Sequence, residues 1–462
     1  MMGQQTTGQN ALFYELCLDN YIPKEHLLRQ IDQVLDLTKL RQHLSTYYSH
    51  TGRPSIDPEL MIRMLIIGYC YGIRSERRLC EEVQLNLAYR WFCRLGLEDQ
   101  VPDHSTFSKN RHGRFRHSDT LRFLFEDIVS RCIAEGLVGG EGFAVDASTI
   151  RADVNWERGV VGKDILDHLN PDDATRPVRE YLDGLGKGDF QGAIPKKISL
   201  TDPCSRWASN RKGAADYLYS NNYLIDIKNN IIMDVEATPN YRPDEVDSTK
   251  TMIDRVEGNF GIKPKRLLGD TAYGVAPMLG WLVDEKHIEP HVPVWDKSDG
   301  SIDTFKRVDF SFDDKADHYR CPGGKLLRRR VRNFKNPRNG VTKDNTIIYR
   351  ASPKDCEHCT RKSYCCPNTT HRKIARSVHE AARDVARALK ETPEYEQSRK
   401  DRKKVEVLFG HMKNIHKFER LRLRGIKGAH DEFLLVAIAQ NLRRLARLCF
   451  QPPSDETIGM LT

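Results

Sequence analysis

Three acidic residues that lie far apart in the chain occupy positions where their charge needs an explanation. Asp146 lies inside Gly142–Ile150, a segment of small and β-branched residues that predicts a strand, where Asp is disfavoured. Asp270 directly follows the expected strand segment 265–269 and precedes a Thr-Ala-Tyr-Gly turn. Mixed sheets present ligand-binding groups at such strand ends. Two carboxylates on neighbouring strands could bind hard cations such as Mg²⁺ together. Each Asp taken singly is more often a surface or capping residue.

The third acid, Glu406, belongs to a basic segment that predicts a helix. With 3.6 residues per turn, Arg402, Glu406 and Lys413 share one helical face, which therefore presents a base, an acid and a base in a row. The simpler interpretation is a surface ion pair between Arg402 and Glu406 that stabilises the helix by only about 0.3–0.5 kcal/mol.

The segments around these acids alternate between strands and helices. This alternation, after an opening antiparallel hairpin, predicts a mixed α/β domain with helices on the faces of its sheet. The polar residues 151–215 predict a surface loop. The expected strands are 142–150, 223–227, 231–237, 266–268 and 289–294, and the expected helices are 244–257, one after Gly274, 374–390, 397–413 and 431–448.

Residues up to about 135 predict an all-helical domain. Helix starts are expected at Asp57-Pro58-Glu59, at Ser75 and after Pro102-Asp103, because capping residues precede periodic apolar positions there. The third helix is basic and includes Lys109 and Arg111. Short helices that carry basic residues are compatible with helix-turn-helix DNA binding, and equally with a domain that only packs.

The charge of the chain is modestly basic, and its placement is more informative than its sum. Lys and Arg number 73 against 64 Asp and Glu, for a net charge of +9. Seven basic residues and no acid fall between Lys325 and Arg338. Such a cluster suits a polyanion, although a solvated charged face is an equal alternative. We expect DNA contacts from Arg328, Arg329 and Arg330 in this cluster.

Five of the 12 cysteines gather in one short region. A Cys-x-x-Cys pair followed by two adjacent cysteines has the spacing of a small structural zinc site. The alternative is a set of reduced, half-buried thiols. The expected ligands are Cys321, Cys356, Cys359 and Cys365, with Cys366, His358 or His371 as substitutes.

Taken together and in this order, the segments resemble the DDE transposases of bacterial insertion sequences. The first Asp lies in Phe143–Thr149, and the second is followed by Thr-Ala-Tyr-Gly. The third acid stands in a family signature of Tyr, Arg, Glu and Lys, which the chain matches at Arg402, Glu406 and Lys413. Arg399 stands where the family has Tyr, so the signature is incomplete.

The resemblance extends into the N-terminal region. The segments Pro58-Glu59-Leu60 and Pro102-Asp103-His104-Ser105-Thr106-Phe107 are similar to the helical domain common in this group. The resemblance implies an RNase H-like core that is interrupted by a cysteine-bearing insertion. The expected domains are a helical DNA-binding domain at 1–135, the first part of the core at 140–299, a basic Cys-rich insertion at 300–372, and the second part of the core with the Glu helix at 373–450.

The resemblance also implies a reaction. Asp146, Asp270 and Glu406 would hold two Mg²⁺ or Mn²⁺ ions that catalyse in-line phosphoryl transfer, cutting transposon ends and joining them to target DNA. Arg402 and Lys413 would position phosphates. The expected partners are terminal inverted repeats, target DNA and a second copy of the chain in a synaptic homodimer.

Two other functions remain open, and both are compatible with the same location in the cell. An RNase H-like nuclease or recombinase without transposition would share every carboxylate, and a non-catalytic DNA-binding regulator would use only the basic segments. No secretory signal is visible at the N-terminus, and the longest apolar run, 60–71, is interrupted by Arg63 and too short for a bilayer. We therefore expect a cytoplasmic, nucleoid-associated protein without a membrane partner.

Overall fold

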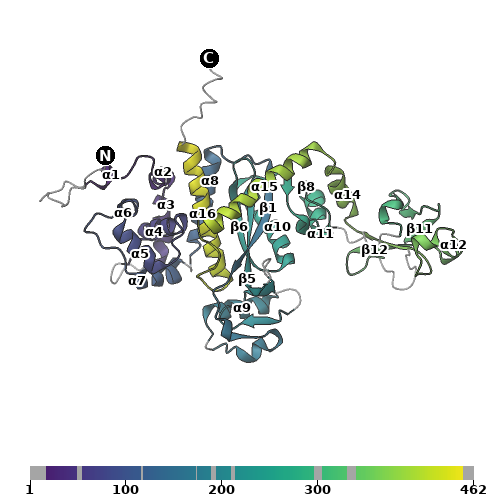
Figure 1. The fold of residues 1–462 in the computed structure, drawn as a ribbon, viewed down its shortest axis with the longest axis horizontal. Coiled ribbons are helices and arrows are strands. Elements are labelled where there is room, and N and C mark those ends of the chain that lie inside the picture. Colours follow the sequence, from purple (N-terminus) through teal and green to yellow (C-terminus); the bar gives the residue numbers. More distant parts are fainter. Residues whose placement is uncertain are drawn as a thin grey trace, which may run out of the picture. The chain divides into compact units, whose positions relative to one another are not determined.

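The computed structural model describes residues 17–48, 55–115, 118–172, 174–188, 194–209, 214–295, 304–329 and 340–450 (Figure 1). The chain forms two compact units. Unit 1 comprises residues 1–139, 147–261 and 405–462, and unit 2 comprises residues 140–146 and 262–404. The long strand β1 (Gly142–Arg151) and the long helix α15 (Pro393–Asn414) each run from one unit into the other.

Unit 1 begins with short helices whose starts follow the predicted capping residues. Asp57 accepts hydrogen bonds from the backbone N–H groups of Glu59 and Leu60, and Ser75 and Asp103 cap the next two predicted starts in the same way. The three starts are therefore confirmed. The helices are α1 (Leu18–Tyr21), α2 (Leu27–Val34), α3 (Thr38–Leu44), α4 (Pro58–Cys70), α5 (Glu76–Leu85), α6 (Leu87–Phe92), α7 (His104–Asn110) and α8 (Thr120–Ala134), with a π-helical turn at Arg111–Phe115.

The C-terminal helix α16 (Ile426–Phe450) is the central element of unit 1. It packs against α2, α4, α8 and β6 (Ile231–Pro239), and Figure 1 shows it in yellow beside α8. Its buried Glu432 accepts hydrogen bonds from Tyr69 and Arg74 and from the backbone N–H groups of Arg422 and Leu423. Burial opposes ionisation of Glu432, yet Arg74 and Arg111 with these N–H groups hold its pKa below the usual value. This ion-pair network fixes the N-terminal helices to the core.

The strands of unit 1 form the hairpin that the sequence predicts, with longer arms. β5 (Ala215–Asp226) pairs antiparallel with β6 and with β4 (Arg206–Ser209), and it lies next to β1 in the sheet. The helix α10 (Arg242–Phe260) packs on β5 and β6. No helix within the described ranges is long and apolar enough to cross a membrane.

The prediction of a surface loop at 151–215 is wrong in part. This segment contains β2 (Gly159–Val161) paired with β3 (Lys197–Ser199), and the helix α9 (Arg176–Lys187). Apolar Val178 and Tyr181 of α9 are buried on one side, and Gly188 ends the helix with φ of 76°. The many Gly, Pro and Asp residues of this segment favoured a loop, although it contains an amphipathic helix of ordinary length.

Unit 2 contains the parallel part of the sheet. β1 pairs parallel with β7 (Arg266–Leu268), and β7 pairs parallel with β8 (Glu289–His291). The helices α11 (Ala276–Gly280) and α14 (Glu380–Leu389) pack on each other through Leu279, Ala382 and Ala386. The strand order β4-β5-β1 in unit 1 and β1-β7-β8 in unit 2 agrees with the RNase H-like core that the resemblance implies.

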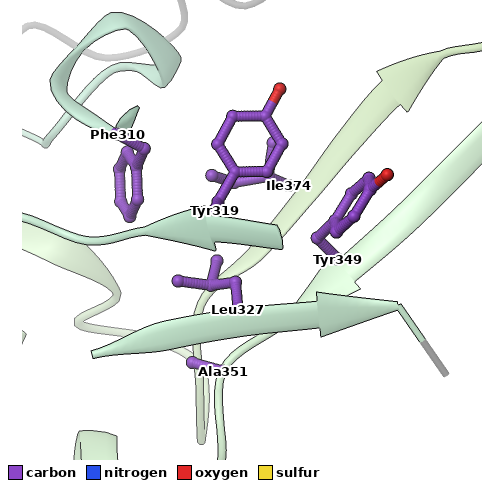
Figure 2. Close-up of a cluster of buried hydrophobic side chains, with 6 residues drawn as sticks. All are labelled: Phe310, Tyr319, Leu327, Tyr349, Ala351 and Ile374. Carbon is purple, nitrogen blue, oxygen red and sulfur yellow. The ribbon is translucent and has the colours of Figure 1, made fainter. Parts of the chain in front are cut away.

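The insertion carries a separate five-stranded antiparallel sheet in unit 2, in the order β13-β12-β11-β10-β9. Aromatic side chains fill one face of this sheet, as Figure 2 shows for Tyr319 and Tyr349 around Leu327. The short helices α12 (Pro353–Glu357) and α13 (Lys362–Cys365) follow β12. The strands are β9 (Ser311–Asp313), β10 (His318–Arg320), β11 (Leu326–Arg329), β12 (Thr346–Arg350) and β13 (Lys373–Ser377).

The helix predicted at 374–390 is wrong over its first part. Residues Lys373–Ser377 form β13, which pairs with β12 over its whole length, and the helix α14 begins only at Glu380. Ile374 is buried in the aromatic cluster, whereas Lys373 and Ala375 are exposed, so the segment alternates as a strand does.

Candidate active site

The first predicted carboxylate, Asp146, lies within β1, and the second, Asp270, follows two residues after the end of the neighbouring parallel strand β7. The register pairs Gly142 with Arg266 and Ala144 with Leu268. Continued by two residues, the same register sets Asp146 opposite Asp270. Register partners on adjacent strands point to the same face, and the strands lie about 4.8 Å apart. Two carboxylates in this relation can share cations.

The residues that precede the two aspartates are in close contact. A Cβ atom on Gly269 would lie 3.3 Å from Cγ1 of Val145 and 3.1 Å from the ring of Tyr273. The strands therefore approach each other directly before the acids, and a larger residue than glycine would push them apart. Asp146 and Asp270 are both half-buried, so they remain open to solvent on one side.

The turn after β7 fixes the Asp270 side chain. Oδ1 of Asp270 accepts a hydrogen bond of 2.7 Å from the backbone N–H of Ala272, which caps the 3-10 turn Thr271–Tyr273. The other carboxylate oxygen can bind a ligand. Asp270 can therefore cap the turn and act as a metal ligand at the same time. Gly274 closes the turn where a Cβ atom would meet the carbonyl oxygen of Pro293 at 1.9 Å, so only glycine fits there.

Glu406 lies on the helix α15, as the sequence predicts. The first half of α15 is anchored in unit 2 by His291 at the end of β8. Nδ1 of His291 lies 2.8 Å from Oγ of Ser398, and its ring stacks on Tyr395 with centroids 5.6 Å apart. Burial and the nearby Arg266 lower the pKa of His291, which favours a neutral imidazole.

The second half of α15 is anchored in unit 1 by its apolar side. The ring of Phe409 stacks on Tyr223 of β5 at 5.2 Å, and Sδ of Met412 accepts a hydrogen bond from Nδ2 of Asn221 at 3.2 Å. Gln440 of α16 donates to the carbonyl oxygen of Leu408. Glu406 itself is exposed, because it lies away from these buried positions.

The helical signature is thus present as one continuous helix. Arg402 and Lys413 are half-buried, and Arg399, at the family's Tyr position, is exposed and forms an ion pair with Glu396 at 2.9 Å. Among the residues that the structure describes, no three His, Cys, Asp or Glu side chains are grouped so that they would hold a metal ion. The structure brings together the strand segments before Asp146 and Asp270 and places Glu406 on α15.

The predicted DNA contacts differ in their surroundings. Lys109 is exposed on α7, whereas Arg111 is buried, with its guanidinium 2.9 Å from Glu76 and 2.9 Å from the Tyr69 hydroxyl. Arg328 is exposed, and Arg329, on the other face of β11, lies 3.7 Å from Asp317. Arg330 lies outside the described residues.

The cysteines of the insertion lie next to its sheet, Cys356 and Cys365 in the short helices α12 and α13 and Cys321 and Cys359 outside helices and strands. The sulfur atoms of Cys321 and Cys359 flank Gly323, where a Cβ atom would lie 3.6 and 3.8 Å from them. Sγ of Cys321 accepts a hydrogen bond from the backbone N–H of Lys325. Cys356 and Cys365 pack against the aromatic cluster, and burial raises the pKa of Cys356 and, to about 12, that of Cys365. Without a metal ion, burial therefore favours the protonated thiols of Cys356 and Cys365.

Two parts of the chain match known families. Residues 16–113 match the family described as Transposase domain (DUF772), and residues 320–446 match the family described as Transposase DDE domain. The chain is a DDE transposase of insertion-sequence type. The transposase thus acts on DNA and depends on divalent metal. No curated protein matches the chain.

Sequence reasoning missed the residues that position the transposase's candidate site. His291 anchors α15, and Gly269 and Gly274 allow the close approaches around Asp270. His291 carries the same signal that singled out Asp146, because it is a polar side chain inside a segment that predicts a buried strand. The two glycines flank Asp270 in the sequence and could have been recognised as points of close approach.

Proposed function

We propose that Asp146, Asp270 and Glu406 together bind the two divalent cations, Mg²⁺ or Mn²⁺, with which the transposase cuts transposon ends and joins them to target DNA. The parallel register of β1 and β7, which would set Asp146 opposite Asp270 when continued by two residues, supports this proposal. Carboxylate oxygens are the ligands that these ions prefer. When bound, the ions supply charge stabilisation and an activated water or 3′-hydroxyl for in-line displacement at phosphorus.

The chain's own residues supply the positioning. Arg402 and Lys413 lie on the same helix as Glu406 and would hold phosphate oxygens beside it. Asp270 is fixed in orientation by the backbone N–H of Ala272, so it needs no rearrangement to act as a ligand. Within unit 1, the packing of Phe409 and Met412 would hold the part of α15 that carries Glu406.

We propose that further basic residues bind DNA. Lys109 on α7 and the exposed Arg328 in the insertion would contact phosphates of the terminal inverted repeats, together with Arg329 and Arg330. Arg111 would act through its ion pair with Glu76, which supports the helix that carries Lys109. Two copies of the chain would pair the ends as a homodimer, and the place of action would be the nucleoid.

The reaction itself gives the test. The transposase should join an oligonucleotide that carries the inverted repeat flanking its gene to a target plasmid when Mg²⁺ is present. Removal of divalent metal should abolish both cutting and joining, because the displacement depends on the ions. Gel analysis of labelled ends separates the two steps. Cutting without joining would establish the nuclease alternative, and binding without either step would establish the non-catalytic regulator.

We also propose a structural zinc ion held by Cys321, Cys356, Cys359 and Cys365, with Cys366, His358 or His371 as the substitutes. The convergence of Cys321 and Cys359 on Gly323 supports two of these ligands. The N–H bond to Cys321 is of the kind that orients a metal-bound thiolate. A bound cation would also offset the burial that raises the pKa of Cys356 and Cys365.

Elemental analysis of the purified transposase is expected to find one zinc ion per chain. The double substitution Cys356→Ser with Cys359→Ser should lose the ion and lower the thermal stability of the insertion, because such sites contribute binding energy to folding. Cys80→Ser, at a buried cysteine outside the insertion, is the matched control and should keep the zinc. Metal-free wild-type protein would reject the site.

A further inference from the structure

The insertion sheet β9–β13 has two faces of opposite character. Its core face carries the aromatic cluster, and Figure 2 shows Tyr319, Leu327 and Tyr349 gathered there. Side chains alternate between the faces along each strand. The residues next to these three, His318, Arg328 and Arg350, therefore point to the opposite face.

The register aligns the basic residues of this opposite face in one row. His318 on β10 pairs with Arg328 on β11, Arg328 pairs with Arg350 on β12, and Arg350 pairs with Lys373 on β13. We call Arg328, Arg350 and Lys373, together with His318, the basic row. Four adjacent strands at about 4.8 Å spacing give the row a length of about 14 Å. Asp313 on β9 continues the row beyond His318.

The two arginines and the lysine of the basic row lack the partners that cations on the core face have. Arg328, Arg350 and Lys373 are exposed, and none of the three has an ion pair or a side-chain hydrogen bond within the described part of the chain. On the core face, Arg376 lies 3.9 Å from the Phe312 ring centre and Arg372 donates to two backbone carbonyl oxygens. Arginines on the core face of the sheet therefore have partners, whereas Arg328 and Arg350 on the opposite face have none in the described part of the chain.

Like charges directly opposite each other on antiparallel strands destabilise a sheet. The fold nevertheless aligns three permanent cations, and an anion along the row would remove this repulsion. Arg328 and Arg350 also line one cavity of about 460 Å³ with Lys325, where Asp355 is the single acidic residue of the lining. The cationic side chains therefore converge on a common space.

We propose that the basic row binds the sugar–phosphate backbone of a DNA duplex. The proposal rests on the proposed function only in taking DNA as the substrate of this region. Duplex DNA carries one negative charge per roughly 1.7 Å of its axis, so several phosphates can face a row of this length. Exposed arginines and lysine suit phosphate oxygens, and contacts to phosphates carry no sequence information, so we expect this binding to be independent of sequence.

The salt dependence of DNA binding tests the row. The triple substitution Arg328→Ala, Arg350→Ala and Lys373→Ala should lower the slope of log Kd against log salt by about 2–3, because each lost phosphate contact removes about 0.9 from it. Binding is measured by fluorescence anisotropy without added Mg²⁺, so that no cleavage occurs. Replacing both arginines by Lys should keep the slope, because the charges remain.

A matched control removes the same charge elsewhere in unit 2. Lys315→Ala with Lys343→Ala and Lys390→Ala, three exposed positions outside the row, should change the slope far less than the row variant. Lys373→Glu alone provides a milder variant at an exposed position and should also lower the slope. An unchanged slope in the triple alanine variant, or an equal fall in the control, overturns the proposal.

Cleavage assays with Mg²⁺ separate this proposal from the active-site assignment. If the wild-type protein cuts DNA but the row variants bind as it does, the row is refuted and the active site stands. If the row determines the salt slope but the wild-type protein cannot cut or join DNA, the row stands and the proposed function fails.

Discussion

Asp270→Asn is expected to abolish metal-dependent cutting of transposon ends and to leave DNA binding largely unchanged. Asn keeps the shape of the side chain and its hydrogen bond from Ala272, but it removes the charge that a divalent ion needs. Loss of one charged ligand costs several kcal/mol of transition-state stabilisation, or roughly a thousandfold or more in rate. The measurement is single-turnover cleavage of a labelled end.

Asp146→Asn should have an equal effect, since the register of β1 and β7, continued by two residues, sets Asp146 opposite Asp270. Asp284→Asn, an exposed Asp in the same unit and outside the site, is the control and should cut at the wild-type rate. A variant of Asp146 that cuts normally while Asp270→Asn does not would show that the two residues do not serve the same ions.

The carboxylate-bearing elements could be predicted from the sequence because their local patterns agree with their environment. The segments around Asp146 and Asp270 are short, apolar and bounded by turns, and both are strands in the structure. The segment around Glu406 has helical periodicity and few breaking residues, and α15 is even longer than expected.

Other elements depend on partners that lie far away in the chain. Lys373–Ser377 could equally begin a helix, and only pairing with β12 makes it a strand. The burial of Arg111 depends on Tyr69 and Glu76, which no local pattern connects to it. Its basic character suggested DNA, whereas its surroundings favour a structural ion pair.

The distinction between Arg328 and Arg329 shows what sequence alone leaves out. A run of arginines in a strand points to alternate faces, so half of the run turns away from any one partner. Arg328 joins the basic row, and Arg329 faces the side on which Asp317 lies 3.7 Å away. The choice of face follows from burial of Leu327, which lies two positions from Arg329 and therefore shares its face of the sheet.

Glu406→Gln is expected to abolish cutting as fully as Asp270→Asn, with binding to transposon ends retained. Gln preserves helix propensity and side-chain length, so α15 should keep its anchors at Ser398 and Met412. Glu396→Gln on the same helix is the matched control. It loses only an exposed ion pair with Arg399, which stabilises the helix weakly, and it should cut at the wild-type rate.

The double variant Asp270→Asn with Glu406→Gln decides whether the two acids serve the same ions. Residues that act as one catalytic unit are strongly non-additive, so the double variant should cut no more slowly than either single variant. Rates that multiply would mean that Glu406 acts independently of the metal-binding pair. In that case the third ligand must be sought elsewhere, and α15 would serve the reaction only through Arg402 and Lys413.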